Sequence, residues 1–374
     1  MHSITILVAL LVATTLYGAD LKPISSAELC GRCHRSILEA WKRSPHSQAM
    51  ESALFQDVLE IAEADFGTSA RKVCLSCHSP IALHLADLTL QQKVSWEGVT
   101  CDYCHSIREV RLQATNPRAV LEYGLLKSGP LKEVSSMAHG TIFSAIHASS
   151  KICAPCHEYR NALGFAVLTT YSEWEGSSYA KQGKTCQSCH MYQVAGEVVD
   201  PRVKRSRQAL VNLHEMPGSH SLRMLTSTLK AQLFTKREGN QLLVFVEVAN
   251  QGAGHRVPTG SPLRQMVLEV QVDSYDGKHW GEERIYQRII VNERGETIRR
   301  EHIAFMKGAK VFSDTRLAPH ETRLEKFSLP LPQGVRAQVK ASFSFYYSPM
   351  ARPESQNRVT FLTITKLVSE ETAG

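Results

Sequence analysis

The sequence predicts a multidomain protein: a mainly α-helical domain over residues 20–228, followed by an antiparallel β-sandwich of Ig-like type over residues 229–374. Two observations lead to this division. All ten cysteines lie in the first part, where short helical segments occur at 36–43 and 55–64 and strand patterns are weak. The second part has no cysteine and consists largely of segments in which apolar and polar residues alternate, as in half-buried strands.

The N-terminus carries an apolar run from Ile4 to Tyr17 that contains no charged residue and is followed by the small residues Gly18 and Ala19. This pattern is typical of a secretory signal peptide, which we expect over residues 1–19, although no lysine or arginine precedes the run. The run is shorter than the about 20 residues that a membrane-spanning helix needs. We therefore expect export to the periplasm or the cell exterior, and no stable membrane span.

The ten cysteines form five Cys-x-x-Cys pairs, and a histidine follows each pair directly. From the composition, a cysteine is followed by x-x-Cys-His by chance with a probability of roughly one in a thousand. The cysteines are Cys30, Cys33, Cys74, Cys77, Cys101, Cys104, Cys153, Cys156, Cys186 and Cys189. The histidines that follow them are His34, His78, His105, His157 and His190.

This spacing is typical of covalent haem attachment, in which two thiols form thioethers with the two vinyl groups of a porphyrin and the adjoining imidazole binds the iron as proximal ligand. A thioredoxin-like redox motif would not recur five times. Structural zinc needs four ligands for each ion in paired sets, and disulfide staples need no histidine. The sequence therefore predicts five covalently bound haem c groups, whose macrocycles supply apolar surface that the first part otherwise lacks.

Five haems within residues 20–228 lie close together, as rapid electron transfer requires. We expect the second and third haems to be neighbours, and likewise the fourth and fifth, because their motifs are close in sequence. The formal net charge of +7 falls to about +2 once the propionates and ferric cores are counted. The basic excess therefore needs no nucleic acid to explain it, and we expect redox proteins as partners.

The second part contains five alternating segments separated by turn residues, which predict short antiparallel strands. Asp276-Gly277 and Arg294-Gly295 fit hairpin turns between them. We expect Arg264, near the loop 252–260, to meet a haem propionate. The alternating segments are 241–250, 265–277, 283–296, 322–331 and 337–347.

The array CGRCH, WKRSPH, CLSCHSP and GVTCDYCH resembles the multihaem cytochrome c superfamily that includes the tetrahaem partners of hydroxylamine oxidoreductase. The later stretches KICAPCHE, EWEGSSYAKQGKTCQSCHM and GAGHRVPTG are similar to pentahaem forms with a C-terminal β domain. The resemblance implies a mainly helical haem domain, bis-histidine iron and electron transfer. Some members of the superfamily reduce or oxidise small nitrogen or sulfur compounds.

The sixth ligand of each iron has to come from elsewhere in the chain. Six histidines of the first part are candidates, and His255 in the β-domain loop is a weaker seventh. We expect His279, His302 and His320 to be surface residues of strands or turns. The six candidates are His46, His84, His139, His147, His214 and His220.

Part of the first motif region is repeated later in the chain. Trp41-x-x-Ser-x-His46 aligns with Trp174-x-x-Ser-x-Tyr179, so that a phenol replaces an imidazole. Tyr179 either packs beside a haem whose ligand comes from another segment, or lines an iron left open for substrate. Because the candidates already outnumber the irons, packing is the favoured interpretation.

Three functions follow from these features. The favoured one is an electron carrier that passes electrons along its haems to a redox partner or an extracellular acceptor. The alternative is an oxidoreductase with one open haem, although all five motifs end in histidine, unlike those of the pentahaem nitrite reductases. The third is a subunit of a haem filament, which requires self-association.

Overall fold

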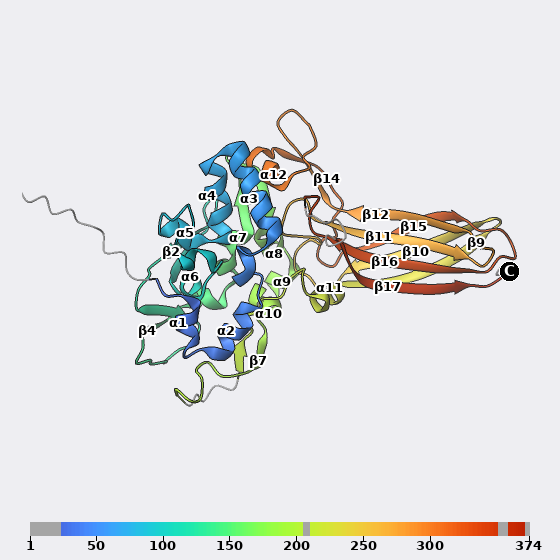
Figure 1. Cartoon of the computed structure of the whole chain (residues 1–374). Helices are drawn as coiled ribbons and strands as arrows, with labels where there is room; N and C mark the ends of the chain where they lie inside the picture. Colours follow the sequence, from blue (N-terminus) through green and yellow to red (C-terminus); the bar gives the residue numbers. More distant parts are fainter. Residues whose placement is uncertain (1–23, 205–209, 351–357, 371–374) are drawn as a thin grey trace, which may run out of the picture.

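The computed structural model describes residues 24–204, 210–350 and 358–370. Figure 1 shows an N-terminal lobe of short helices and loops beside an elongated C-terminal lobe of long strands. The expected signal peptide, residues 1–19, lies outside the described residues. Among the helices in the described part of the chain, none has the length and apolar character needed to cross a membrane.

The N-terminal lobe is built from short helices joined by loops and small two-stranded sheets. The predicted helices at 36–43 and 55–64 are confirmed as α2 and α3. The helices are α1 (Ala27–Gly31), α2 (Arg35–Lys42), α3 (Ala53–Phe66), α4 (Thr68–His78), α5 (Pro80–His84), α6 (Cys101–His105), α7 (Ala154–His157), α8 (Thr170–Glu175), α9 (Ser178–Lys181), α10 (Cys186–His190) and α11 (Leu222–Thr228). The strands are β1 (Ile107–Arg111), β2 (Arg118–Leu121), β3 (Leu126–Gly129), β4 (Gly140–Phe143), β5 (Glu158–Arg160), β6 (Ala166–Thr169), β7 (Gln193–Ala195) and β8 (Leu210–Asn212).

The longest helix of this lobe, α3, shows how sequence sets local structure. The Ser52 hydroxyl accepts a hydrogen bond from the backbone N–H of Phe55 and thereby caps the first turn. Phe55, Leu59 and Ala62 follow one another at helical spacing and are buried. The helix ends at Gly67, whose φ of +64° favours a residue without a side chain.

The C-terminal lobe consists of two antiparallel sheets with strand orders β15-β10-β9 and β12-β11-β16-β17. Alternate side chains of β10 and β11, such as Val246 and Val270, belong to one buried core to which both sheets contribute. The period of two along each strand therefore produces the largest apolar cluster of the described residues. The strands are β9 (Leu229–Glu238), β10 (Gln241–Asn250), β11 (Gln265–Ser274), β12 (His279–Tyr286), β15 (Thr322–Pro330), β16 (Ala337–Tyr346) and β17 (Arg358–Val368).

The antiparallel β prediction is confirmed, since each of the five predicted segments contains a strand. Both predicted turns are confirmed as well, with φ of +87° at Gly277 and +83° at Gly295. Strands β9 and β17 were not predicted, although their residues also alternate. The Ig-like arrangement of the strands stays a prediction.

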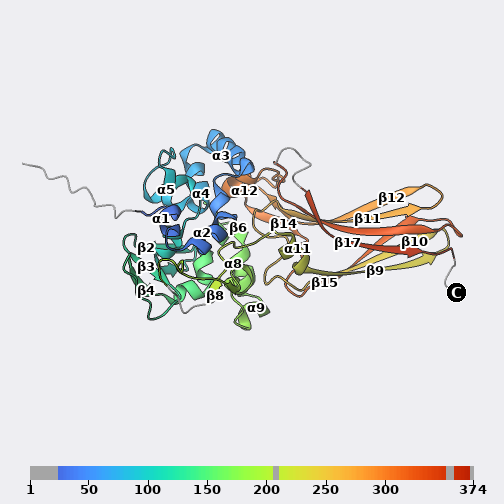
Figure 2. The same cartoon turned by 60° about the horizontal axis from the view of Figure 1, so that its bottom comes forward.

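Residues 288–314 form an arm that reaches from the β lobe to the helical lobe and contains β13 (Arg288–Val291), α12 (Glu301–Lys307) and β14 (Lys310–Asp314). In both views α12 lies beside α3 (Figures 1 and 2). The Asn161 side chain donates a hydrogen bond of 2.7 Å to the Gly308 carbonyl, and His302 Nε2 lies 2.8 Å from an Asp65 oxygen. The expectation that His302 is a surface residue is therefore wrong: it is buried on a helix that docks against the other lobe.

The β core should unfold more readily when a buried side chain is shortened. Leu268 is fully buried between the sheets, so Leu268→Ala should lower the free energy of unfolding by about 3 kcal/mol. Chemical denaturation of the whole chain, followed by far-ultraviolet circular dichroism, measures this change. Leu324→Ala is the matched control, since Leu324 is 59% exposed, and an equal loss in both variants would contradict the assignment of the core.

Candidate haem-binding site

A cavity of about 2590 Å³ runs through the helical lobe and reaches the β lobe. Sites for drug-sized ligands usually measure about 300–1,000 Å³, so this cavity is large enough for several such groups. Its wall is mainly apolar and includes all ten cysteines and the five histidines that follow them. Its size, its apolar wall and this set of donors fit several covalently attached haems.

Short helices present the thiols and imidazoles to the cavity. In α4, Cys74, Cys77 and His78 have the spacing i, i+3 and i+4, which places all three on one face of the helix. Helices α6 and α10 each begin at the first cysteine of a motif and end at its histidine. A threonine before each of these two helices caps its first turn, so the start of the helix is set by the residue that precedes the motif.

Thiols from different motifs lie next to one another. Side-chain interactions join Cys30 of the first motif to Cys101 of the third, and Cys153 of the fourth to Cys186 of the fifth. Cys77 of the second motif lies 3.9 Å from the carbonyl oxygen of Cys156 in the fourth. The thiols of the fourth and fifth motifs thus lie together, and the expectation that their haems are neighbours stays a prediction, as it does for the second and third haems. The second motif, however, meets the fourth in this way, because helix packing and not sequence distance decides which motifs touch.

Four of the five motif histidines face a second histidine. Two imidazoles that share one iron have ring centroids roughly 6 Å apart, because each metal–nitrogen bond is about 2 Å long and each centroid lies about 1 Å behind its nitrogen. The observed separations match this value. The pairs are His34 and His139 at 6.2 Å, His157 and His46 at 6.2 Å, His105 and His214 at 6.5 Å, and His190 and His255 at 6.5 Å.

In these pairs one ring nitrogen is commonly held by the protein, which orients the ring and leaves the other nitrogen for a metal. His46 Nδ1 lies 2.9 Å from the sulfur of Met216. For the other such rings, Nδ1 lies near a backbone carbonyl oxygen. These contacts are His34 to Val198 at 2.5 Å, His105 to Ser128 at 2.6 Å, His190 to Pro217 at 2.7 Å, His214 to Asn212 at 2.7 Å, His139 to Gly140 at 3.0 Å and His255 to Arg256 at 3.0 Å.

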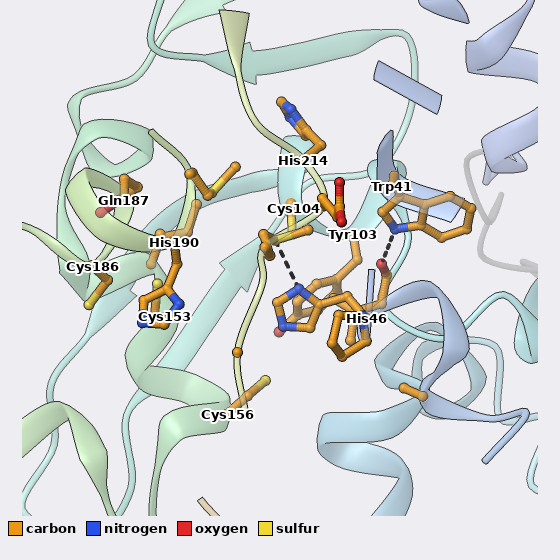
Figure 3. A pocket seen from close by; sticks show the side chains of 18 of the residues that line it. Trp41, His46, Tyr103, Cys104, Cys153, Cys156, Cys186, Gln187, His190 and His214 are labelled. Carbon is orange, nitrogen blue, oxygen red and sulfur yellow. Dashed lines mark hydrogen bonds between the residues drawn. The ribbon is translucent and has the colours of Figure 1, made fainter. Parts of the chain in front are cut away.

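Burial keeps several of these imidazoles neutral. It lowers the pKa of His157 to about 3 and the pKa of His46 and His214 to about 4, and neighbouring histidines add to the effect. The neutral ring has a free nitrogen lone pair and is therefore the form that binds a metal. Figure 3 shows His46, His190 and His214 entering one cavity from segments far apart in the sequence.

Three of the candidate histidines are placed differently. His147 has its ring centroid 5.4 Å from that of His105, but its Nε2 contacts the Cys104 carbonyl at 3.0 Å, and its Nδ1 has no hydrogen-bond partner in the described part of the chain. His220 stacks on Tyr347 with ring centroids 4.7 Å apart. His84 packs at 4.2 Å against Tyr123 and is not among the residues that line the cavity.

The second motif differs from the others in its ring partner. The His78 ring stacks on Phe55 with centroids 3.7 Å apart, and its Nδ1 lies 3.1 Å from the Ala49 carbonyl oxygen. Among the described residues, no other histidine forms a ring contact with His78. Phe55 was not predicted as a site residue, because its only signal in the sequence is its place on the apolar face of a predicted helix.

The Trp-x-x-Ser repeat seen in the sequence is a repeat in structure. Trp41 Nε1 donates to the Val99 carbonyl and Trp174 Nε1 to the Lys184 carbonyl, each at 2.9 Å and each two residues before a motif cysteine. The backbone N–H groups of Val99 and Lys184 donate in turn to the carbonyls of His46 and Tyr179. The two copies therefore hold their attachment motifs in the same way and differ in what residue 46 or 179 contacts.

Tyr179 joins the two lobes. Its hydroxyl donates a hydrogen bond of 2.5 Å to the Gln251 carbonyl, and its ring stacks on His320 at 4.8 Å. Gly254 approaches the Tyr179 ring so closely that a Cβ at 254 would lie 3.1 Å from the tyrosine Cβ. Tyr179 thus contacts the loop that carries His255, which supports the packing interpretation.

The comparisons with known proteins agree with this geometry. Residues 29–106 match the family described as cytochrome c554 and c-prime. The structure of a penta-heme cytochrome c552 from Thermochromatium tepidum superposes with a TM-score of 0.73 at 21% identity, covering 92% of this chain and 99% of that chain. Together, the family match over residues 29–106 and the shared fold support a multihaem c-type cytochrome.

Two further comparisons give no information about the function of this protein. A CARDB domain of the PF1109 protein, solved in complex with di-metal ions from Pyrococcus furiosus, covers 38% of this chain and 85% of its own at 16% identity, with a TM-score of only 0.19. No curated protein matches the chain.

Removing the Tyr179 hydroxyl should loosen the loop that carries His255. Tyr179→Phe keeps the ring stacking but loses one hydrogen bond, worth about 1 kcal/mol. Hydrogen–deuterium exchange measured by mass spectrometry should therefore quicken in residues 250–260. Tyr171→Phe is the matched control, because the Tyr171 hydroxyl donates to Glu175 within its own helix, and faster loop exchange in that variant would contradict the role of Tyr179.

Proposed function

We propose that this cytochrome carries five haem c groups and transfers electrons through them between redox partners. The observation that supports this most directly is the set of four histidine pairs, each with the separation that one shared iron requires, inside a cavity that all ten motif cysteines line. Haem iron supplies one-electron redox chemistry. The protein residues hold the macrocycles, orient the imidazoles and keep them neutral.

We assign proximal and distal ligands on these distances. His34 and His139 would hold the first iron, and His105 and His214 the third. The remaining two pairs are His157 with His46 for the fourth iron and His190 with His255 for the fifth. The fifth assignment uses a residue of the β lobe, so the β lobe would complete the coordination of a haem bound to the helical lobe.

The proposed electron path is branched at the fourth haem. Cys153 and Cys156 of the fourth motif lie beside cysteines of the fifth and second motifs, and electrostatic interaction links both to Cys104 of the third. The first motif reaches this group through Cys101 of the third. Electrons entering at any haem would thus pass close to the fourth.

We also propose export to the periplasm or the cell exterior by removal of residues 1–19, on the strength of the apolar run and the need to attach haem c outside the cytoplasm. The partners would be redox proteins or an extracellular acceptor. A further possibility that we propose is self-association into a haem filament. Electron microscopy of the secreted protein should then show filaments, and discrete particles would contradict it.

An open haem is a second candidate function, and the environment of His78 favours it. Among the described residues, no histidine faces His78 at the separation seen in the other four pairs, so the second iron would keep a coordination position for a small ligand. An oxidoreductase acting on a small nitrogen or sulfur compound would use this position. Added cyanide should then change the visible spectrum of one haem only, and five irons that ignore cyanide would exclude this function.

The number of haems can be counted by mass. The double substitution Cys186→Ala with Cys189→Ala removes both thiols of one motif, so the mature protein should lose the mass of one haem. Intact mass spectrometry under denaturing conditions measures this without requiring a native fold. Ser188→Ala, within the same motif, is the control and should keep all five haems.

The fifth assignment is tested by the spin state of the iron. His255→Ala should convert one low-spin ferric haem to high spin, because the sixth ligand is lost. Electron paramagnetic resonance, combined with a redox titration, counts the low-spin and high-spin irons. His279→Ala is the control, since His279 is exposed and pairs with Asp273 at 2.7 Å. An unchanged low-spin count in His255→Ala would refute the assignment.

A further inference from the structure

A separate polar cluster lies where the β lobe borders the cavity. It consists of Ser261, Arg264, Glu301 and His302, all of which line the cavity wall. Glu301 is 6% exposed and His302 is 2% exposed. Ser261 and Arg264 follow the loop that carries His255, and Glu301 and His302 begin helix α12 of the arm, so the cluster joins two segments of the β lobe at the surface of the cavity.

Among the described residues, five buried polar atoms of the cluster form no hydrogen bond of ordinary geometry, although Ser261 and Ser348 lie close enough to the Glu301 carboxyl to lower its pKa. They are Ser261 Oγ, Arg264 Nε, both carboxyl oxygens of Glu301, and His302 Nδ1. A buried polar group left without a partner costs about 1–3 kcal/mol, and most buried polar groups in proteins are satisfied. Five such atoms gathered at one place therefore indicate a site for a polar ligand.

Other contacts of these side chains set their positions. Arg264 Nη1 donates to the Thr259 carbonyl at 3.1 Å, and the guanidinium lies over the Phe345 ring at 5.9 Å. Gly260 has φ of +91°, and a Cβ there would collide with the Arg264 guanidinium. His302 is held through Nε2 by Asp65 of α3. The cluster is thus already organised by groups outside it.

The chemistry of the cluster suits an anion. Arg264 brings a permanent positive charge and a donor fork that matches a carboxylate. Among the described residues it forms no ion pair with Glu301 or any other acid. Despite the opposing effect of the Arg264 charge, burial raises the pKa of Glu301, which favours the neutral acid, a further donor. Arg264 also lowers the pKa of His78 and His157, which places its charge near the second and fourth motifs.

We propose that Arg264, Ser261, Glu301 and His302 form a binding site for a carboxylate-like oxyanion. Two sources carry this chemistry: a propionate of the second or fourth haem, or a small free anion admitted to the cavity. The first source rests on the proposed haem content. Haem counting by mass tests that content separately. A protein that carries five haems but fails the test below would refute the anion site and leave the proposed function standing.

The test uses the holoprotein, sodium formate as the probe, and two arginine variants. Arg264→Gln removes the charge from the cluster, whereas Arg299→Gln removes the same charge from an exposed position close by in the arm. Isothermal titration calorimetry measures formate binding, and spectroelectrochemistry measures the haem midpoint potentials. Arg264→Lys, which keeps the charge but loses the fork, is the second variant if the glutamine variant does not bind its haems.

A free-anion site predicts saturable formate binding in the wild type and in Arg299→Gln, weakened at least tenfold in Arg264→Gln and to a lesser degree in Arg264→Lys. A propionate site predicts no formate binding in any variant, and a lower midpoint potential of one haem in Arg264→Gln alone, because a positive charge beside the propionate is lost. Equal formate binding in wild type and Arg264→Gln, or neither binding nor any change in potential, would overturn the proposal.

Discussion

Covalent attachment through Cys-x-x-Cys-His is the constraint on which the helical lobe depends. One helical turn brings two thiols and an imidazole to the same face, so each motif needs only a short helix, such as the five-residue α6 and α10. Helices this short are not stable alone in water. The apolar clusters of this lobe are also small beside the β core. The surfaces that stabilise these helices therefore have to include what fills the large cavity between them.

The contacts between motifs place the fourth attachment motif at the centre of the helical lobe. The fourth motif lies in the 3-10 helix η4 (Ser150–Cys153) and in α7, near the second, third and fifth motifs, while the first motif meets the third through Cys30 and Cys101. Such an arrangement suits the exchange of electrons among several haems better than transport in a single line. It also places at the centre the pair His157 and His46, whose pKa values desolvation lowers to about 3 and about 4.

The β lobe contacts the helical lobe at two places, through a loop and through an arm. Its loop 250–260 contacts α8 and α9 through Tyr179, Trp174 and Glu173, whose carboxylate accepts from the Arg256 N–H at 3.1 Å. Its arm packs α12 on α3. The two copies of the Trp-x-x-Ser repeat differ in their role here. The first copy contributes the imidazole of His46 to the cavity, whereas the second copy uses the phenol of Tyr179 to hold the loop from which His255 enters the cavity.

Features that depend on neighbouring residues could be predicted from the sequence. The attachment motifs follow from spacing within one helical turn, and four of the seven strands in the two large sheets, with the end of β12, follow from a period of two. The sequence could name histidines but could not pair them, because His34 and His139, or His190 and His255, meet only through packing of distant segments. The stacking of Phe55 on His78, the absence of His84 from the cavity wall and the burial of His302 could not be predicted, since each depends on which surfaces of separate elements come into contact.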